Sequence, residues 1–332
     1  MTNGNRPPMS EEKKELLTRL SRADSLFYIL ISACTREPYV QCDEETYDDE
    51  VLLFFDEEAA KGKTKELAVQ KIPTVPAKMT SRQMLLFFTS LFTMGVNAIR
   101  IHGTAGEDCI QVNEIVKKRD RKEMPDGSVW VENPQLHLTA VYFAQELRRP
   151  ASEDRKAHLL ELQEEMAADF KRGRFIFALQ KEGKGTPMLK MKNGEKYQPI
   201  FTDILEFKKF CKDDAFRPVV VDANQLPKVL DKEAKGVVLN IQGVNLPLTV
   251  SRQQPSAAKN QTVKPTTPRS AMDLVNAAIA EASARESREA NAALETANAA
   301  AERALAAHGA EGLSEAEPGE MLDDVFSSEP EE

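Results

Sequence analysis

The segment KYQPIFTDILEFKKF, residues 196–210, carries the signals that decide the fold. Its first six residues favour a short strand. Asp203 and Glu206 then have the D-x-x-E arrangement of a helix start, because each carboxylate can accept hydrogen bonds from N–H groups that lack partners in the first turn. We therefore predict a strand over 196–201 that leads directly into a short helix over 203–211.

The elements predicted around this segment alternate between helices and short strands. Lys192-Asn193-Gly194 is a hairpin signal, since Asn-Gly tolerates the positive φ of a tight turn. Apolar residues at helical spacing from Leu159 to Phe170 predict a helix before it. In chain order we predict a helix over 154–171, strands over 174–179, 187–191 and 196–201, a helix over 203–211, a strand over 217–222, a helix over 225–230, and strands over 236–241 and 246–250.

The first half of the chain repeats this order, which indicates an internal duplication. It begins with a predicted helix over 10–22 and strands over 25–31 and 50–56. Thr80-Ser81-Arg82-Gln83 is a capping box that starts a helix over 81–91, whose Phe-rich part is apolar on nearly all sides and is expected to be buried. The segment 57–71 is interpreted as an insertion. After it, we expect 72–79 to correspond to 196–201, 97–102 to 217–222, 110–118 to 225–230, and 127–132 to 236–240. The last element, 136–143, is either a strand or the start of a helix to Arg149.

The predicted fold class is α+β, or mixed α/β, with two similar small domains at 10–150 and 154–250. Each domain combines a mixed sheet with short helices. The following segment, 251–270, is rich in Ser, Thr, Gln and Pro and predicts a flexible linker. Sixteen Ala in 271–308 predict a helix, and 309–332 predicts an acidic disordered tail.

The paired segments resemble the SseB N-terminal domain family. The resemblance rests on a strand that ends in Phe201-Thr202, an acidic-capped helix, the Val-rich strand 218–222, and the late segment Gly236–Asn240. It covers 172–250 once and 24–145 again more loosely, with Thr80 in the place of Thr202 and the late Asn133-Pro134 retained. The resemblance implies small mixed α/β domains, apparently two tandem copies, in a bacterial cytoplasmic protein; it provides no catalytic residues.

The charge of the chain is concentrated at its C-terminal end. The formal net charge is −9, and 311–332 contains nine Asp and Glu with no Lys or Arg, so that 1–310 is formally neutral. This excludes a broadly basic protein that coats nucleic acid. The basic run 117–122 has one aromatic residue nearby and is interpreted as a solvated loop rather than a nucleic-acid site.

The C-terminal segments offer two interaction features. A thin, Ala-rich seam is formed by Leu294, Ala297, Ala301, Ala304 and His308. It would support only weak coiled-coil association, and a solvated single helix and a partner-dependent helix both remain open. Further on, four apolar residues would share one face of a short helix, which is the form of a docking motif, although any disordered tail contains some apolar residues. These candidate partner-docking residues are Met321, Leu322, Val325 and Phe326.

Composition and hydropathy predict a cytoplasmic protein without a membrane span. The four cysteines form no C-x-x-C pair and have no His at zinc-finger spacing, as expected of thiols in a reducing compartment. The most apolar segment, 84–96, is shorter than the ~20 residues that a spanning helix needs.

No catalytic, cofactor-binding or metal-binding residue is predicted. Thr80 and Thr202 are interpreted as helix caps rather than nucleophiles, because no His accompanies either Thr in its segment. A His102–Cys109 pair is disfavoured, because the carboxylates beside the thiol would oppose thiolate formation. The acidic run 43–50 lacks the glycine of a calcium loop and is interpreted as a solvated loop.

These observations favour a non-enzymatic adaptor whose tail recruits a protein partner. They do not identify the partner or the oligomeric state. The alternative is a ligand-binding or enzymatic function in the cleft between the two domains. The strand ends near His102, Asn133, Asp222 and Asn240 would then form the site.

Overall fold

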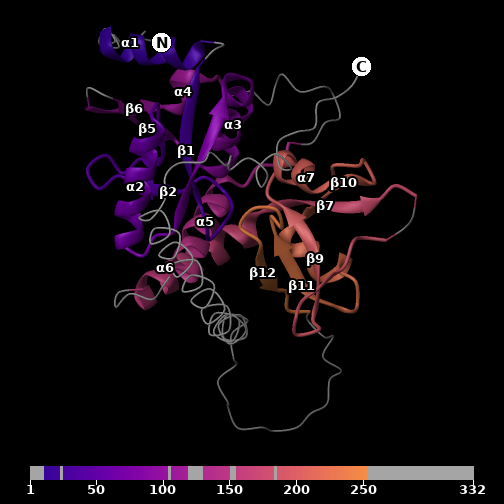
Figure 1. The fold of residues 1–332 in the computed structure, drawn as a ribbon. Coiled ribbons are helices and arrows are strands. Elements are labelled where there is room, and N and C mark those ends of the chain that lie inside the picture. The colour runs from indigo at the N-terminus through magenta and orange to yellow at the C-terminus, as the bar shows by residue number, and fades with distance from the viewer. Residues whose placement is uncertain are drawn as a thin grey trace, which may run out of the picture. The chain divides into compact units, whose positions relative to one another are not determined.

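The structure is a computed structural model of the chain (Figure 1). It describes residues 11–22, 25–103, 106–118, 130–149, 155–182 and 185–252. The predictions for most of the linker, the Ala-rich helix, the acidic tail and its four docking residues lie outside this range, as does most of the basic run. Both sheets described below lie within one compact unit of the chain.

The first sheet has six strands and mixed pairing. Its order is β4-β1-β3-β5-β6, with β2 paired to β3. β3 and β5 are parallel, and the other neighbouring strands are antiparallel. The strands are β1 (Leu26–Ser32), β2 (Val40–Cys42), β3 (Asp49–Phe54), β4 (Thr74–Thr80), β5 (Ala98–Gly103) and β6 (Gly106–Gln111).

The second sheet repeats this topology. Its order is β10-β7-β9-β11-β12, with β8 paired to β9 and with β9 and β11 parallel. The strands are β7 (Arg174–Gln180), β8 (Leu189–Lys190), β9 (Lys196–Phe201), β10 (Phe216–Asp222), β11 (Ala234–Leu239) and β12 (Leu246–Thr249). The predicted mixed α and β architecture with two similar sheets is therefore confirmed.

The helices occupy equivalent positions in the chain order of the two copies. α1 (Glu11–Ser21) precedes β1 as α6 (Arg155–Arg172) precedes β7, and α2 (Glu57–Val69) follows β3 as α7 (Ile204–Phe210) follows β9. α3 (Ser81–Met94) takes the place of the short η2 (Ala223–Gln225) and α8 (Leu226–Val229). α4 (Val112–Ile115) and α5 (Pro134–Arg148) complete the first copy.

The repeat exists, but several predicted correspondences were wrong. β3, not 72–79, is the counterpart of β9, and β5 is the counterpart of β11 rather than of 217–222. The supposed insertion at 57–71 is α2, the counterpart of α7. The residues of 110–118 begin as strand β6 before α4, and Trp130–Glu132 is not a strand. The cause is the strand order, because β4 follows β3 in the chain but pairs with β1, and β10 follows β9 but pairs with β7.

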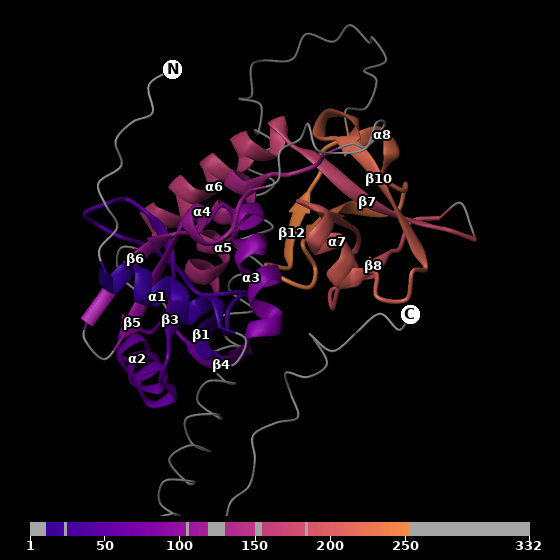
Figure 2. The same ribbon diagram turned by 90° about the horizontal axis from the view of Figure 1, so that it is seen from above.

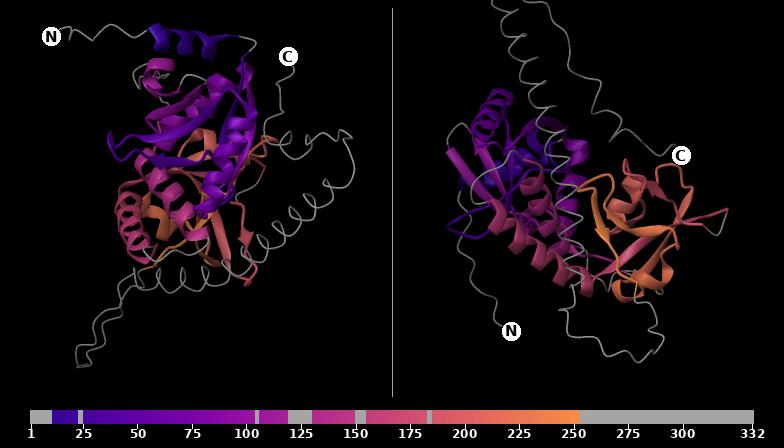
Figure 3. Two further views of the ribbon diagram at one scale, coloured as in Figure 1. Left: turned by 60° about the vertical axis from the view of Figure 1, so that its left-hand side comes forward. Right: turned by 90° about the horizontal axis from the view of Figure 1, so that it is seen from below.

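A single apolar core joins the two copies. Alternate residues of a strand point to opposite faces of its sheet. Phe27 and Ile29 of β1 therefore enter the same core as Phe175 and Phe177 of β7. Phe143 and its apolar neighbours on α5 fill this core, and Figures 2 and 3 show α5 beside α6. The opposite faces pack separately, the first under α2 and the second against α7.

The Phe-rich helix α3 differs from its prediction. Phe87, Phe88 and Leu91 are buried, but Leu85 and Leu86 are exposed. Helix α3 therefore carries more apolar residues than the core buries. Among the described helices, none combines the length and the apolarity needed to cross a membrane.

Candidate functional site

A group of polar side chains is buried where the two copies meet. All of them except Lys209 are nearly or fully buried, and Lys209 is half-buried. Such burial is costly unless every group finds partners. This group, here called the junction cluster, consists of Glu37, His137, Thr202, Asp203, Glu206, Lys209 and Asn240.

The corner between β9 and α7 provides its foundation. Asp203 is the N-cap of α7, and its Oδ1 accepts hydrogen bonds from the N–H groups of Leu205 at 2.8 Å and Glu206 at 3.1 Å. This confirms the predicted cap at Asp203, which satisfies orphan donors of the first turn. The same role predicted for Glu206 was wrong, because its Oε1 is held by Lys209 and its Oε2 has no hydrogen-bond partner among the described residues. The cap interpretation of Thr202 was wrong, since its hydroxyl donates to Asp203 Oδ2 at 2.8 Å instead. Thr80 does form its predicted capping box with Gln83.

Asn240 fixes Thr202 from the neighbouring strand. β11 is parallel to β9, so that both strands end at the same edge of the sheet. Asn240 has a φ of +45°, which Asn tolerates better than most residues. Its Oδ1 accepts from the Thr202 N–H at 3.0 Å, and its Nδ2 donates to the Thr202 hydroxyl at 2.9 Å. Asn133, before α5, donates to the carbonyl of Thr202 at 2.8 Å.

His137 connects this corner to the first copy. It lies on α5, with Nδ1 at 3.3 Å from Thr202 Oγ1 and 3.7 Å from Asp203 Oδ2. Its Nε2 lies 3.3 Å from Oε2 of Glu37, a residue of the segment between β1 and β2. A Cβ at Gly243 would stand 2.2 Å from Glu37 Oε1, so the β11–β12 turn needs glycine to approach this carboxylate.

Lys209 of α7 completes the cluster. Its ammonium donates to Glu37 Oε1 at 3.4 Å and to Glu206 Oε1. Three carboxyl groups therefore face one imidazole and one ammonium. Removing either cation would leave buried carboxylates without compensation.

Burial and charge act in opposite directions on the ionisable groups of the cluster. Burial alone would lower the pKa of His137, but the Glu37 charge and the hydrogen bond to Asp203 outweigh it and raise that pKa to about 10. Burial would raise the pKa of both Glu37 and Asp203, and His137 reverses both shifts, so that these values lie below normal. Burial and then the Glu37 charge raise the pKa of Glu206 to about 7. Burial opposes the charge of Lys209, but Glu206 and Glu37 raise its pKa.

The alignment of Thr202, His137 and Glu37 has the order of a nucleophile, a base and an orienting carboxylate. All three side chains are sealed from solvent, and the hydroxyl already donates to Asp203. The arrangement therefore holds the two copies together and offers the hydroxyl no route to a substrate. The sequence predicted no site role for Glu37, His137 or Lys209, and for Glu206 only a role in the helix start. The position of His137 among the apolar residues of α5 was a usable signal.

The four strand-end residues predicted for a cleft do not converge. Asn133 and Asn240 both contact Thr202. His102 lies in the first copy, where its Nδ1 is 2.9 Å from Glu107 and its ring stacks on Phe54. Asp222 forms an ion pair with Arg174 at 3.1 Å.

The His102–Cys109 pair and the acidic run 43–50 both take part in contacts within the first sheet. Cys109 lies opposite Arg100 in the β5–β6 pair, while His102 lies opposite Glu107. The acidic run 43–50 is not merely a solvated loop, because Glu50 is fully buried. Its carboxylate and that of Asp43 both pair with Arg100, which provides the cation for this run.

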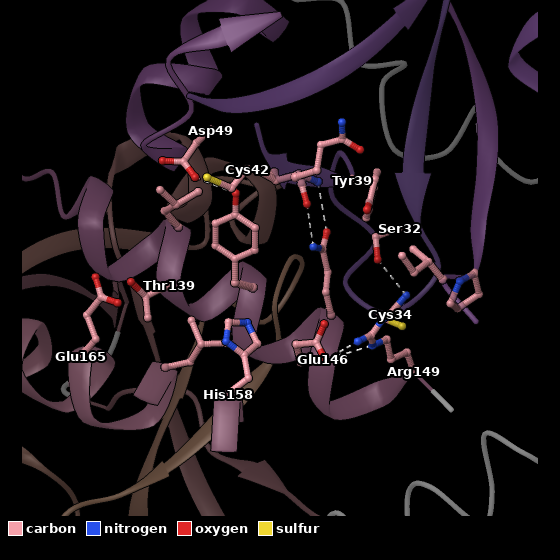
Figure 4. Close-up of a pocket in the computed structure, with 18 of the residues that line it drawn as sticks. Ser32, Cys34, Tyr39, Cys42, Asp49, Thr139, Glu146, Arg149, His158 and Glu165 are labelled. Atoms are coloured by element: carbon pink, nitrogen blue, oxygen red, sulfur yellow. Dashed lines mark hydrogen bonds and ion pairs between the residues drawn. The ribbon is translucent and has the colours of Figure 1, made fainter. Parts of the chain in front are cut away.

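A pocket of about 650 Å³ lies beside the junction, between the β1–β2 region, α5 and α6. Tyr142 donates to Asp49 at 2.6 Å on its wall, and Glu146 pairs with Arg149 at 2.8 Å. Figure 4 shows Thr139 and Glu165 on one side of the pocket and Cys34 with Arg149 on the other. The carboxylate and basic residues of the lining are Glu44, Asp49, Glu146, Glu165, Arg149 and His158.

Comparison with known proteins gives few matches. No family model matches the chain, and no curated protein matches it. Tic22 from Plasmodium falciparum is 12% identical, covering 67% of this chain and 90% of its own, with a TM-score of 0.20. Anabaena Tic22, described as a protein of protein transport, is 10% identical over 69% of this chain and 93% of its own, with a TM-score of 0.18. These values carry no argument about function, and the resemblance to SseB domains stays a prediction.

Proposed function

We propose that this chain is a non-enzymatic adaptor of the bacterial cytoplasm with an SseB-like body. The observation that supports this proposal is the contrast between the two polar sites. The junction cluster is buried apart from Lys209 and most of its groups pair with one another, whereas the pocket offers surface to a ligand. A rigid body with an open binding surface suits a protein that holds partners together.

The lining of the pocket indicates what kind of group it takes. Arg149 is already paired with Glu146. Glu44 and Glu165 have no cationic partner among the residues that the structure describes. The remaining charge is therefore negative, which complements a lysine or arginine side chain of a partner. The tail, through Met321, Leu322, Val325 and Phe326, is proposed as the second attachment point.

Affinity capture from the source cell tests both contacts. The baits are the full chain, a variant lacking 251–332, and the double variant E44K/E165K, with E182K as the matched surface control. We expect the deletion to lose the tail-bound partner and the pocket variant to lose a different one. An unchanged set of bound proteins in the deletion removes the recruiting role of the tail, and an unchanged set in E44K/E165K removes that of the pocket.

A second candidate, ligand binding at the junction between the two copies, is favoured by one specific observation. Glu206 Oε2 is buried and has no hydrogen-bond partner among the described residues.

A further inference from the structure

Three side chains of the junction cluster bring metal-ligating atoms together. One ligand atom from each of Glu37, His137 and Glu206 lies within 4.8 Å of the others, and all three residues are buried. His137 Nε2 is 3.3 Å from one Glu37 oxygen and 3.4 Å from the other. Atoms bound to one Zn²⁺ at ~2.0–2.2 Å in a tetrahedral site lie about 3.3 Å apart. The His137–Glu37 spacing therefore fits two ligands of one ion.

The Glu206 carboxylate is a second, independent indication. Its residue is 2% exposed, and Oε2 has no hydrogen-bond partner among the described residues, while Oε1 is held by Lys209. A buried polar atom without a partner is rare in folded proteins and requires a physical explanation. A cation between Glu206 and Glu37 would satisfy it.

The ring orientation of His137 already suits metal binding. Thr202 Oγ1 and Asp203 Oδ2 both face Nδ1. The N–H of Nδ1 therefore donates to this side, which leaves Nε2 directed at Glu37. A metal-bound histidine commonly donates its other ring N–H to a carboxylate, which orients the ring and raises its basicity.

From this geometry we propose that Glu37, His137 and Glu206 bind a divalent cation of the zinc class, and that Lys209 is the resident cation that the metal displaces. Lys209 contacts both carboxylates, and its side chain is 38% exposed, so that the ammonium can turn out to solvent. The exchange balances charge, because one dication replaces the ammonium and the proton on Nε2, which passes to solvent. Two carboxylates and one imidazole are ligands that zinc accepts.

Calorimetric titration of the full chain with Zn²⁺ tests the proposal, with visible absorption of Co²⁺ as a report on coordination. We expect one saturable site in the wild type. K209M should bind at least ~10-fold more tightly, because the competing ammonium is gone, whereas K209R should not. H102Q, which alters the more exposed His102–Glu107 pair, should bind as the wild type does.

Two ligand variants identify the site. H137Q and E206Q should each lose the saturable site, and circular dichroism shows which of them is folded. If H137Q fails to fold, loss of Zn²⁺ binding in E206Q tests the site instead. The tighter Zn²⁺ binding expected of K209M is a further measurement that depends on neither ligand variant. Binding that survives in folded H137Q or E206Q, or absent binding in both wild type and K209M, overturns the proposal. Neither result tests partner binding at the pocket or the tail, which the capture experiment measures separately.

Discussion

The two copies contain the same strand-to-helix corner in different surroundings. Phe54-Phe55-Asp56 ends β3 and begins α2, as Phe201-Thr202-Asp203 ends β9 and begins α7. Asp56 and Asp203 are both N-caps. In the first copy the cap is exposed, and Phe55 packs against the guanidinium of Arg19, 3.7 Å from the ring centroid. In the second copy the corner is covered by α5 and the segment after β1.

The neighbouring strand shows the same contrast. His102 lies opposite Phe54 in the parallel pair of the first sheet, and Asn240 lies one step beyond the Ile200–Leu239 pair of the second. His102 stacks on Phe54 and pairs with an exposed carboxylate, whereas Asn240 is sealed against Thr202. One local signal therefore gives an ordinary helix cap where solvent covers it and a buried charge network where protein covers it.

The largest expected difference is between the two capping aspartates. Asp203→Ala should lower the free energy of unfolding by about 3–5 kcal/mol, because it leaves His137 charged and buried with one fewer partner. Asp56→Ala should cost about 1 kcal/mol, the value of an exposed cap. Urea unfolding of both variants measures the two losses, and similar losses would remove the distinction between the corners.

Adding a methyl group at a glycine tests how tightly each copy is packed around its corner. Gly243→Ala should cost about 1–3 kcal/mol, since the new methyl group would collide with Glu37. Gly62→Ala in α2 should instead stabilise the protein by about 1 kcal/mol, because nothing lies within 4 Å and alanine favours helix. Thermal unfolding compares them. A neutral Gly243→Ala would mean that the turn is free to move away from the carboxylate.

The threonines at the ends of β9 and β4 give a smaller difference. Thr202→Val keeps the shape but removes a hydroxyl that serves Asn240 and Asp203, so we expect a loss of about 1–3 kcal/mol. Thr80→Val removes only the hydroxyl bond to Gln83 at a solvent-exposed corner, so we expect a loss of at most about 1 kcal/mol. Chemical denaturation ranks the two. A larger loss at Thr80 contradicts the interpretation.

The smallest expected effect concerns Asp49 in the pocket beside the junction. Burial raises the pKa of Asp49 above its ordinary value of 3.8. The stability associated with this shift is present below that value and is lost as the pH rises through the folded-state pKa. Asp49→Asn keeps an acceptor for Tyr142 but removes the ionisable group. The wild type loses stability between pH 4 and pH 7 and the variant does not. The unfolding free energy of the variant minus that of the wild type should therefore be higher at pH 7 than at pH 4. Urea titrations at the two pH values decide this, and an unchanged difference would show that Asp49 is not desolvated.

Local signals made much of the fold predictable. The acidic cap at Asp203, the capping box at Thr80 and the strand and helix periods depend on residues a few positions apart. They sufficed for the fold class and for the existence of a repeat. They did not suffice for the correspondences, because sheet order depends on contacts that the local pattern does not encode.

The junction cluster depends on contacts across long stretches of chain. His137 is 100 positions from Glu37 and 65 from Thr202, and Lys209 is 172 positions from Glu37. No spacing rule connects residues so far apart. The polar residues His137 and Gln145 within apolar α5 indicate that this helix meets buried polar groups, but not which ones.

Helix α5 has a consequence for the synthesis of the protein. Ten of its fifteen residues are buried, and His137 among them finds Thr202 only in the second copy. A ribosome adds ~5–20 residues per second, so the remaining chain to residue 252 takes on the order of 5–20 s to follow α5. During that interval the nascent first copy presents the largely apolar buried face of α5, and the second-copy partners of His137, Thr202 and Asp203, have not yet been made.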